Sequence, residues 1–178
     1  MTLRLATMDD AAALEALIAE SVHGLQAGDY TAAQRDAALG TVLGLDRTLI
    51  GDGTYFVVEA EGRIVACGGW SRRRTLFGAD GVPGKDDAWL DPATDPARIR
   101  AFFVHPQWAR RGLGTRILEA CEGAARAAGF RRLELAATLT GIAFYRVHGY
   151  REGERIEVPL RGGENLPVVR MTKEAGIE

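Results

Sequence analysis

The sequence predicts an α/β domain in which about four helices flank a mixed, mostly antiparallel sheet of about seven strands. The chain has 178 residues, of which 47% are hydrophobic, enough to build one core of ordinary size. Short apolar runs typical of strands are interspersed with segments whose apolar residues recur at helical spacing. Neither an internal repeat nor a linker divides the chain, so residues 1–178 are expected to form one domain.

The first elements are predicted to be a strand and two helices. Residues 3–6 alternate apolar and polar positions, as a half-buried strand does. Two capping-box patterns, each a threonine followed three residues later by Asp or Gln, predict one helix that begins near Met8 and a second over 32–39. Residues 40–53 have no clear periodicity and are left unassigned.

Two strands and a long loop are predicted next. Residues 54–60 and 64–70 are rich in Val, Ile, Tyr, Phe and Trp, and the short segment between them contains a glycine, which favours a β-hairpin. Residues 71–98 then lose all periodicity and hold three prolines and five aspartates. A loop of this length inside a compact domain is usually disordered or functional.

The second half of the chain alternates strands and helices before it ends in two strands. Residues 99–104 form a short apolar strand, which Pro106 terminates. Apolar residues on one face then predict a helix that starts near Leu113 and stops before Gly129. The remaining predicted elements are a strand over 133–139, a helix over 140–148, and strands over 155–160 and 166–172.

Charge, hydropathy and cysteine content exclude several classes of partner. The net charge of −2 gives no global positive field for nucleic acid or an anionic membrane. The N-terminus lacks the pattern of a signal peptide, and no apolar run approaches the roughly 18 residues that span a bilayer. Cys67 and Cys121 lie in apolar stretches, where reduced, buried thiols are expected. We therefore expect a cytoplasmic protein with neither nucleic acid nor membrane as a partner.

Metal and serine-nucleophile chemistry are also not indicated. The three histidines lack metal-ligand spacing, and the sequence contains no Cys-x-x-Cys, His-Glu-x-x-His or Gly-x-Ser-x-Gly motif. No metal is expected.

Residues 105–115, HPQWARRGLGT, carry the clearest binding signal. Two glycines at the start of a helix let successive backbone N–H groups point the same way, and with the helix dipole they form an anion site. Arg110 and Arg111 add positive charge at its edge. The segment therefore predicts a bound phosphate or pyrophosphate.

This segment departs from two common phosphate-binding motifs. A P-loop requires a lysine directly after its second glycine, and none is present there. A dinucleotide fingerprint requires a small residue where Ile117 stands and a glycine directly after the strand, whereas seven residues separate Val104 from Gly112. Glu134 lies about where a ribose-binding acid would, which leaves an NAD(P)-dependent oxidoreductase as an alternative.

The segment 99–150 resembles the GNAT superfamily of N-acetyltransferases. Residues 109–114 are similar to the acyl-CoA-binding pattern (Gln or Arg)-x-x-Gly-x-(Gly or Ala), with Ala109 in the first position. The sequence AFYRVHGY at 143–150 looks like the second signature, a helix with Phe-Tyr that ends in Gly and an aromatic residue. Thr138 stands where the family often has asparagine. The order of elements agrees over essentially the whole chain, so a GNAT-like fold is expected.

The resemblance implies transfer of an acetyl group from acetyl-CoA, the cosubstrate, to a primary amine of a small molecule or peptide, by direct attack in a ternary complex. The strand at 99–104 would splay from its neighbour and place its last two residues beside the thioester. The cofactor-binding residues so implied are Phe103, Val104, Arg110, Arg111, Gly112, Leu113, Gly114, Thr115 and Thr138. A non-catalytic acyl-CoA-binding sensor is the alternative function.

The resemblance also implies that Tyr145 is the catalytic acid, because it places this phenol close to the thioester sulfur. An amine with a pKa near 10 must lose a proton before it attacks, and the departing thiolate needs a donor. Many family members supply the base from a glutamate on the strand before the CoA loop, but residues 99–104 contain no carboxylate. The candidate bases that stay open are Glu134, His105, Asp95, His23 and water.

The sequence leaves the acceptor amine unspecified. Three arginines at 72–74 and five aspartates between Asp80 and Asp95 place opposite charges side by side, so charge does not select an acceptor. The exposed edge expected at the two final strands favours a homodimer, since pairing of edges removes unpaired backbone groups.

Overall fold

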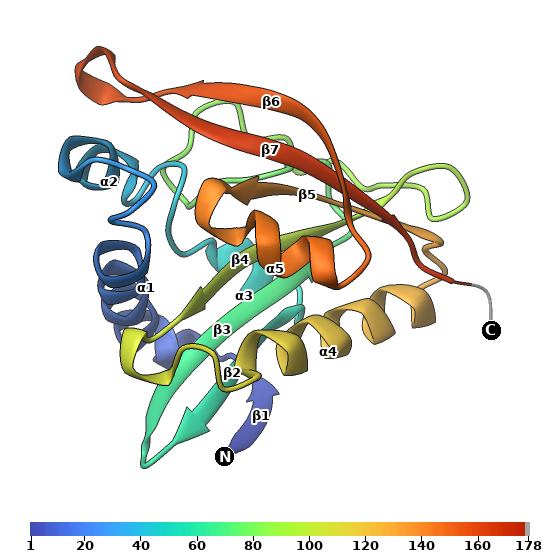
Figure 1. The fold of residues 1–178 in the computed structure, drawn as a ribbon. Coiled ribbons are helices and arrows are strands. Elements are labelled where there is room, and N and C mark those ends of the chain that lie inside the picture. Colours follow the sequence, from blue (N-terminus) through green and yellow to red (C-terminus); the bar gives the residue numbers. More distant parts are fainter. Residues whose placement is uncertain (177–178) are drawn as a thin grey trace.

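A computed structural model describes residues 1–176, which fold around one seven-stranded sheet with the strand order β1-β2-β3-β4-β5-β7-β6 (Figure 1). The strands are β1 (Thr2–Leu5), β2 (Tyr55–Ala60), β3 (Arg63–Ser71), β4 (Ala97–Val104), β5 (Arg132–Thr138), β6 (Arg151–Pro159) and β7 (Asn165–Glu174). Every neighbouring pair is antiparallel except β4 and β5, which are parallel. The predicted α/β class and mixed sheet are confirmed.

Helices cover both faces of this sheet. The α-helices are α1 (Ala11–Leu25), α2 (Ala32–Ala38), α3 (Arg47–Gly51), α4 (Leu113–Ala127) and α5 (Ile142–Val147). Short 3-10 turns lie at Met8–Asp10, Pro106–Trp108, Leu139–Gly141 and Arg161–Gly163. Buried residues of α4 and α5 form one hydrophobic cluster with the sheet, and buried residues of α1, α2 and α3 form a second. Figure 1 shows α4 and α5 together in front of the sheet, with α1 and α2 to their left.

Three elements differ from their predicted form. A fifth α-helix, α3, lies in the unassigned segment 40–53, where five helical residues are too few to produce a periodic pattern. Strand β6 begins at Arg151, four residues before the predicted start at 155, because its first residues are exposed and carry no apolar alternation. The first helix also begins at Ala11, after the 3-10 turn that the capping box at Thr7 initiates.

The most consequential feature for function is a gap between β4 and β5. These parallel strands pair only at Ala97–Leu133 and Arg98–Glu134, so the splay that the family resemblance implied is confirmed. Beyond this point β4 is irregular. Its Ala101 has a φ of +55°, a left-handed conformation that is uncommon outside glycine. The Tyr55 hydroxyl holds this bulge by donating a hydrogen bond of 2.9 Å to the Ala101 carbonyl.

The 71–98 loop is ordered, and charged side chains fasten it to the rest of the protein. Arg73 pairs with Asp52 at 2.7 Å, and Lys85 donates to Asp46 at 2.6 Å. These contacts join the loop to the segment around α3. The loop is therefore a fixed wall of the structure.

The carboxylate of Asp46 pairs with two cations beneath this loop. Asp46 is 1% exposed. Arg100 from β4 donates hydrogen bonds to the Asp46 carboxylate at 3.0 Å and to the Gly78 carbonyl at 2.7 Å. Burial alone would raise the pKa of Asp46, but the hydrogen bond from Lys85 and the charge of Arg100 outweigh burial and lower it. The buried group is therefore a carboxylate at neutral pH.

Replacing Asp46 by asparagine should lower the free energy of unfolding by about 3–5 kcal/mol, because it leaves Arg100 and Lys85 without their counter-ion. The folded-state pKa of Asp46 lies below its ordinary value of 3.8. Its contribution to stability is therefore complete above that value and is lost as the pH falls through the folded pKa. Denaturant unfolding at several pH values should show that the variant loses less stability with acid than the wild type does.

Asp80→Asn provides the matched control, because Asp80 also pairs with an arginine, Arg47, but its side chain is 39% exposed. Exposed pairs contribute little, so this variant should lose less than about 1 kcal/mol. Equal losses for the two variants would contradict a structural role for the buried pair.

Candidate active site

A cleft of about 250 Å³ passes through the gap between β4 and β5. Gly114, Phe144 and Tyr145 line it from the face of the sheet that carries α4 and α5. Ser21 and Gln26 line it from the opposite face, which carries α1. Because its lining comes from both faces, the cleft crosses the sheet.

The N-terminus of α4, where the sequence predicts an anion site, borders this cleft at Gly114. Gly112 has a φ of +80° and Arg110 a φ of +60°, which turns the chain sharply into the helix. The first hydrogen bond of the helix runs from the Arg116 amide to the Gly112 carbonyl. Within residues 1–176, the backbone N–H groups of residues 110–115 have no protein acceptor. Such consecutive unpaired donors at a helix N-terminus bind phosphate oxygens.

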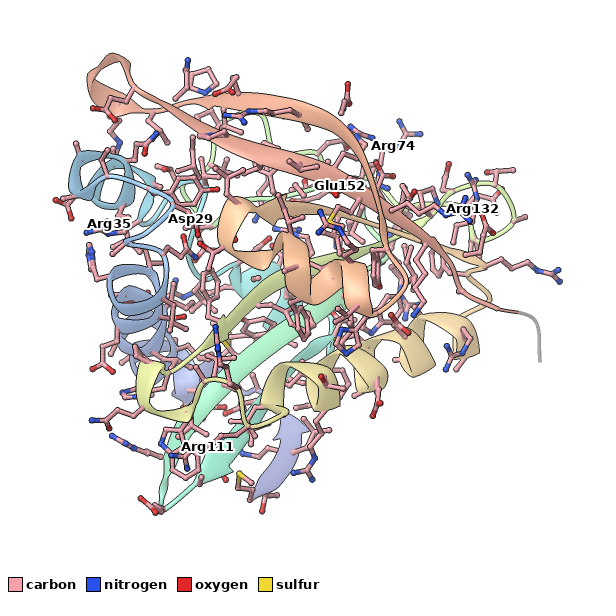
Figure 2. All side chains as sticks on the ribbon, in the orientation of Figure 1. Asp29, Arg35, Arg74, Arg111, Arg132 and Glu152 are labelled. Carbon is pink, nitrogen blue, oxygen red and sulfur yellow. The ribbon has the colours of Figure 1, made fainter. Side chains whose placement is uncertain are left out.

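The two arginines of this segment are placed differently. The Arg111 guanidinium lies over the Trp108 ring, 4.7 Å from its centroid, beside the loop that leads into α4 (Figure 2). Arg110 is exposed and forms no ion pair with any described residue. Both positive charges are therefore available to an anion at the helix N-terminus.

Helix α5 packs directly against this anion site. A side chain at Gly114 would place its Cβ 3.2 Å from the Phe144 ring, so glycine allows the close approach of the two helices. His148 Nδ1 lies 2.7 Å from the Phe144 carbonyl, which can only accept, so this nitrogen carries the proton. The other ring nitrogen then accepts from the Thr115 hydroxyl at 3.1 Å. The Thr115 hydroxyl therefore already has a hydrogen-bond partner in the protein, whereas the backbone amide of Thr115 has none among the described residues.

Tyr145 lies in the cleft, within a cluster of aromatic rings. It is 8% exposed, and its ring meets those of Phe102, Phe144 and Tyr150 edge to face, with centroids 6.2, 5.0 and 5.6 Å away. Burial raises the pKa of the Tyr145 phenol. Among residues 1–176, its hydroxyl makes no hydrogen bond. The phenol therefore keeps its proton and has a donor to offer.

The predicted pantetheine contacts also line the cleft. Phe103 and Val104 lie at the end of β4, where the Val104 amide donates to Ser21 Oγ at 3.3 Å. Thr138 lies at the end of β5, where its hydroxyl oxygen accepts from the Gly141 amide at 3.2 Å. That hydroxyl still has its hydrogen to donate.

The first two candidate bases are engaged elsewhere. Glu134 is buried, and its carboxylate pairs with Arg170 and, at 2.8 Å, with Arg98. His105 uses both ring nitrogens: Nε2 lies 2.7 Å from a Glu20 carboxylate oxygen, and Nδ1 accepts from a backbone amide at 3.2 Å. Neither residue lines the cleft. Because its carboxylate is paired with two arginines, Glu134 is also unavailable to bind the ribose of a dinucleotide.

The other two candidate bases also lie outside the cleft. His23 lies between Arg35, 3.4 Å away, and Asp36, 3.6 Å away, on the surface formed by α1 and α2. Asp95 accepts a backbone hydrogen bond within the 71–98 loop. None of the four candidate side chains lines the cleft, so water is the candidate base that is left.

The wall on the α1 face was not predicted from the sequence. It consists of two polar residues at α1, Ser21 and Gln26, together with apolar and glycine residues from α1, from the segment before α3 and from the 71–98 loop. The apolar and glycine residues are Leu25, Val42, Leu43, Gly44, Leu76, Phe77 and Gly78. They belong to segments without a motif, and only folding brings them together.

Over residues 1–176 no helix combines the length and apolar character needed to span a bilayer. The same residues contain no group of three or more His, Cys, Asp or Glu side chains that could hold a metal ion.

Comparison with known proteins agrees with this geometry. Residues 19–150, which include the anion site and α5, match the model of the acetyltransferase (GNAT) family. A search of curated proteins gave no significant match.

Solved structures with similar folds include several acyl-CoA proteins. A GCN5-related N-acetyltransferase from Rhodopseudomonas palustris is 24% identical, with a TM-score of 0.71 over 97% of this chain and 94% of that one. YncA from Salmonella typhimurium, a putative acetyltransferase solved with acetyl-CoA, is 20% identical, with a TM-score of 0.62 over 100% and 95%. The GphF GNAT-like decarboxylase, solved with isobutyryl-CoA, is 19% identical, with a TM-score of 0.68 over 99% and 100%.

Proposed function

The chain belongs to the GNAT family of acetyltransferases, which depend on acyl-CoA, and from this premise we propose that it transfers an acetyl group from acetyl-CoA to a primary amine of a small molecule or peptide. The observation that carries the proposal is the cleft that crosses the sheet between β4 and β5. A ligand on the α4 face and one on the α1 face would meet inside it. Such a meeting supports direct attack in a ternary complex.

The two thiols support direct attack over a covalent acyl-enzyme. Cys67 and Cys121 are both buried, and neither lines the cleft. Burial raises the pKa of Cys67 to about 12 and also raises that of Cys121. Both thiols are therefore protonated at neutral pH and are poor nucleophiles.

The residues on the α4 face fit the chemistry of coenzyme A. The unpaired amides of residues 110–115 would hold the pyrophosphate, with Arg110 and Arg111 adding charge. Phe103 and Val104 would flank the pantetheine arm. Thr138 would donate its hydroxyl hydrogen to the amide groups of that arm.

Tyr145 would assist the departure of the thiolate. Bound acetyl-CoA supplies a thioester whose carbonyl carbon accepts the amine lone pair while the C–S bond breaks, and the proton lost by the amine ends on the CoA sulfur. The Tyr145 phenol donates its O–H toward that sulfur as negative charge develops there. Because burial raises the pKa of this phenol, it is protonated throughout the physiological range.

We assign removal of the amine proton to water. Arg100 and Tyr145 are the titratable side chains that line the cleft, and neither can accept a proton in its resting state. Arg100 is cationic and paired with Asp46, and Tyr145 is protonated. The base is therefore solvent in the cleft.

The proposal is tested by thermal-shift titrations with acetyl-CoA, CoA and NADH, followed by detection of free CoA in the presence of amines. A ligand that binds only the folded state raises its stability by RT ln(1 + [L]/Kd). We expect stabilisation by acetyl-CoA and CoA, and CoA release with an amine. Stabilisation by acetyl-CoA without CoA release from any amine would instead support the acyl-CoA-binding sensor. Stabilisation by NADH alone would contradict both functions.

The apolar cleft without a carboxylate or imidazole base also suits a second function, decarboxylation of a malonyl-type acyl-CoA. In that reaction the carboxylate leaves as CO₂, its bonding electrons pass to the α-carbon, and this carbon takes a proton from solvent. No nucleophile has to be deprotonated. Incubation with malonyl-CoA distinguishes the two functions, since only a decarboxylase would convert it to acetyl-CoA.

A further inference from the structure

The side-chain amide of Gln26, like the Tyr145 hydroxyl, lies in the cleft without a hydrogen-bond partner among the described residues. Gln26 lies at the C-terminal end of α1, is 6% exposed and lines the cleft. Its Oε1 atom is buried and has no hydrogen-bond partner among the described residues. A buried acceptor without a donor is destabilising, because it has lost its hydrogen bonds to water and gained none in the protein. Such a group in a binding cleft is explained when a ligand supplies the missing donor.

The polar side chains near Gln26 already have partners. Ser21 Oγ and Thr138 Oγ1 each accept a hydrogen bond from the main chain. Thr140 donates its hydroxyl hydrogen to Asp29 at 2.7 Å. Figure 2 shows Asp29 between α2 and the start of α5. Gln26 Oε1 is thus a buried side-chain acceptor in the cleft wall that has no partner at all among the described residues.

The rest of the α1-side wall is apolar and carries no free charge. Its large side chains are Leu25, Val42, Leu43, Leu76 and Phe77. Arg100 is the charged residue that lines the cleft, and its guanidinium is satisfied by Asp46 and by two backbone carbonyls of the 71–98 loop. Asp46 is itself shared with Lys85. A second ammonium on the acceptor would therefore be buried here without a counter-ion, and a carboxylate would have to compete with Asp46 for Arg100.

We propose that Gln26 positions the acceptor by accepting a hydrogen bond from its amine nitrogen, and that this acceptor is a primary amine whose remaining part is apolar and uncharged. The inference rests on the proposed acetyltransferase function and adds the substrate class to it. The amine N–H satisfies Oε1, and the apolar part of the molecule packs against the α1-side wall. Charged acceptors are disfavoured because burial of an unpaired charge is strongly unfavourable.

The substrate class is tested by CoA release from acetyl-CoA with 2-phenylethylamine, spermidine and glutamate. We expect kcat/KM for 2-phenylethylamine to exceed that for the other two amines by at least about 100-fold, because the latter bring unpaired charges into the cleft. Equal or faster release with spermidine or glutamate would overturn the substrate class while the acetyltransferase function stands. Binding of acetyl-CoA without release from any of the amines would overturn the function itself.

The role of Gln26 is tested by Gln26→Met, which keeps the length of the side chain and removes its amide. We expect the KM for 2-phenylethylamine to rise about 10-fold or more, with the KM for acetyl-CoA unchanged. The melting temperature should stay the same or increase, because the variant no longer buries an unpaired acceptor. A change of less than about twofold in the amine KM would overturn this role.

Gln34→Met is the matched control. Gln34 on α2 has both ends of its amide satisfied, accepting from the Thr31 amide at 2.9 Å and donating to the Asn165 carbonyl at 2.9 Å. It does not line the cleft. Its substitution should lower the melting temperature and leave both KM values unchanged. The two glutamines are therefore expected to give opposite results in binding and in stability, and a rise in amine KM for Gln34→Met equal to that for Gln26→Met would overturn the assignment.

Discussion

Replacing Gly114 by glutamate should weaken the binding of acetyl-CoA at least about 100-fold, because it places a carboxylate at the N-terminus of α4 where phosphate oxygens are expected to bind. Like charges in contact cost several kcal/mol, and each 1.4 kcal/mol is a factor of ten in affinity. The new side chain also enters the narrow space beside Phe144, 3.2 Å from where its Cβ would lie. Isothermal titration calorimetry with acetyl-CoA measures the change.

The same substitution further along the helix separates loss of binding from loss of folding. A side chain at Gly123 would meet nothing within 4 Å, and Gly123 lies on α4 away from the anion site. Gly123→Glu should therefore bind acetyl-CoA as the wild type does, and both variants should keep the circular dichroism of the folded protein. Undiminished affinity in Gly114→Glu would contradict the assignment of this helix end to the pyrophosphate.

Replacing Tyr145 by phenylalanine should lower kcat about 100-fold, within the range that loss of a general acid usually gives, while the KM for acetyl-CoA changes little. The reason is that the variant retains the buried ring but loses the donor that faces the departing sulfur. Because burial raises the pKa of the phenol, the wild-type rate should not fall from deprotonation of Tyr145 at mildly alkaline pH. Steady-state kinetics as a function of pH, with CoA release as the signal, test both expectations.

Tyr150→Phe is the control for Tyr145, since its ring lies in the same aromatic cluster with a centroid 5.6 Å away. The Tyr150 hydroxyl donates to Glu122 at 2.9 Å, and the same carboxylate pairs with Lys173. Its removal should reduce stability by about 1 kcal/mol and leave kcat essentially unchanged. If the two variants lost activity equally, or if Tyr145→Phe lost none, Tyr145 would be a packing residue.

Much of the fold could be predicted from the sequence because its main elements are long and periodic. Helix α4 has 15 residues with a clear apolar face, and it was predicted almost to its ends. The short helix α3 was missed, since five residues do not complete two turns. The start of β6 at Arg151 was missed as well, because a strand exposed on both faces has no reason to alternate apolar and polar residues.

The turn that leads into α4 could also be predicted from the sequence, whereas the cleft wall on the α1 face could not. Residues 110–115 are adjacent in the chain, so the two glycines among them are enough to predict that their backbone N–H groups face the same way. The candidate bases show the opposite case. Glu134 was a plausible base in the sequence, yet the fold pairs it with Arg98 and Arg170 and removes it from the cleft. A carboxylate's neighbours 36 residues away are not visible in its local sequence.

The α/β class, the order of most elements and the glycine turn at the start of α4 could be predicted from the sequence, because each of these depends on residues that are adjacent or regularly spaced along the chain. The passage of the cleft through the sheet, the pairing of Asp46 with Arg100 and Lys85, and the unpaired Gln26 amide in the wall become visible only in the folded structure. The physical reason is that burial and pairing are properties of contacts between distant segments. Their energies depend on the surroundings that a side chain acquires on folding.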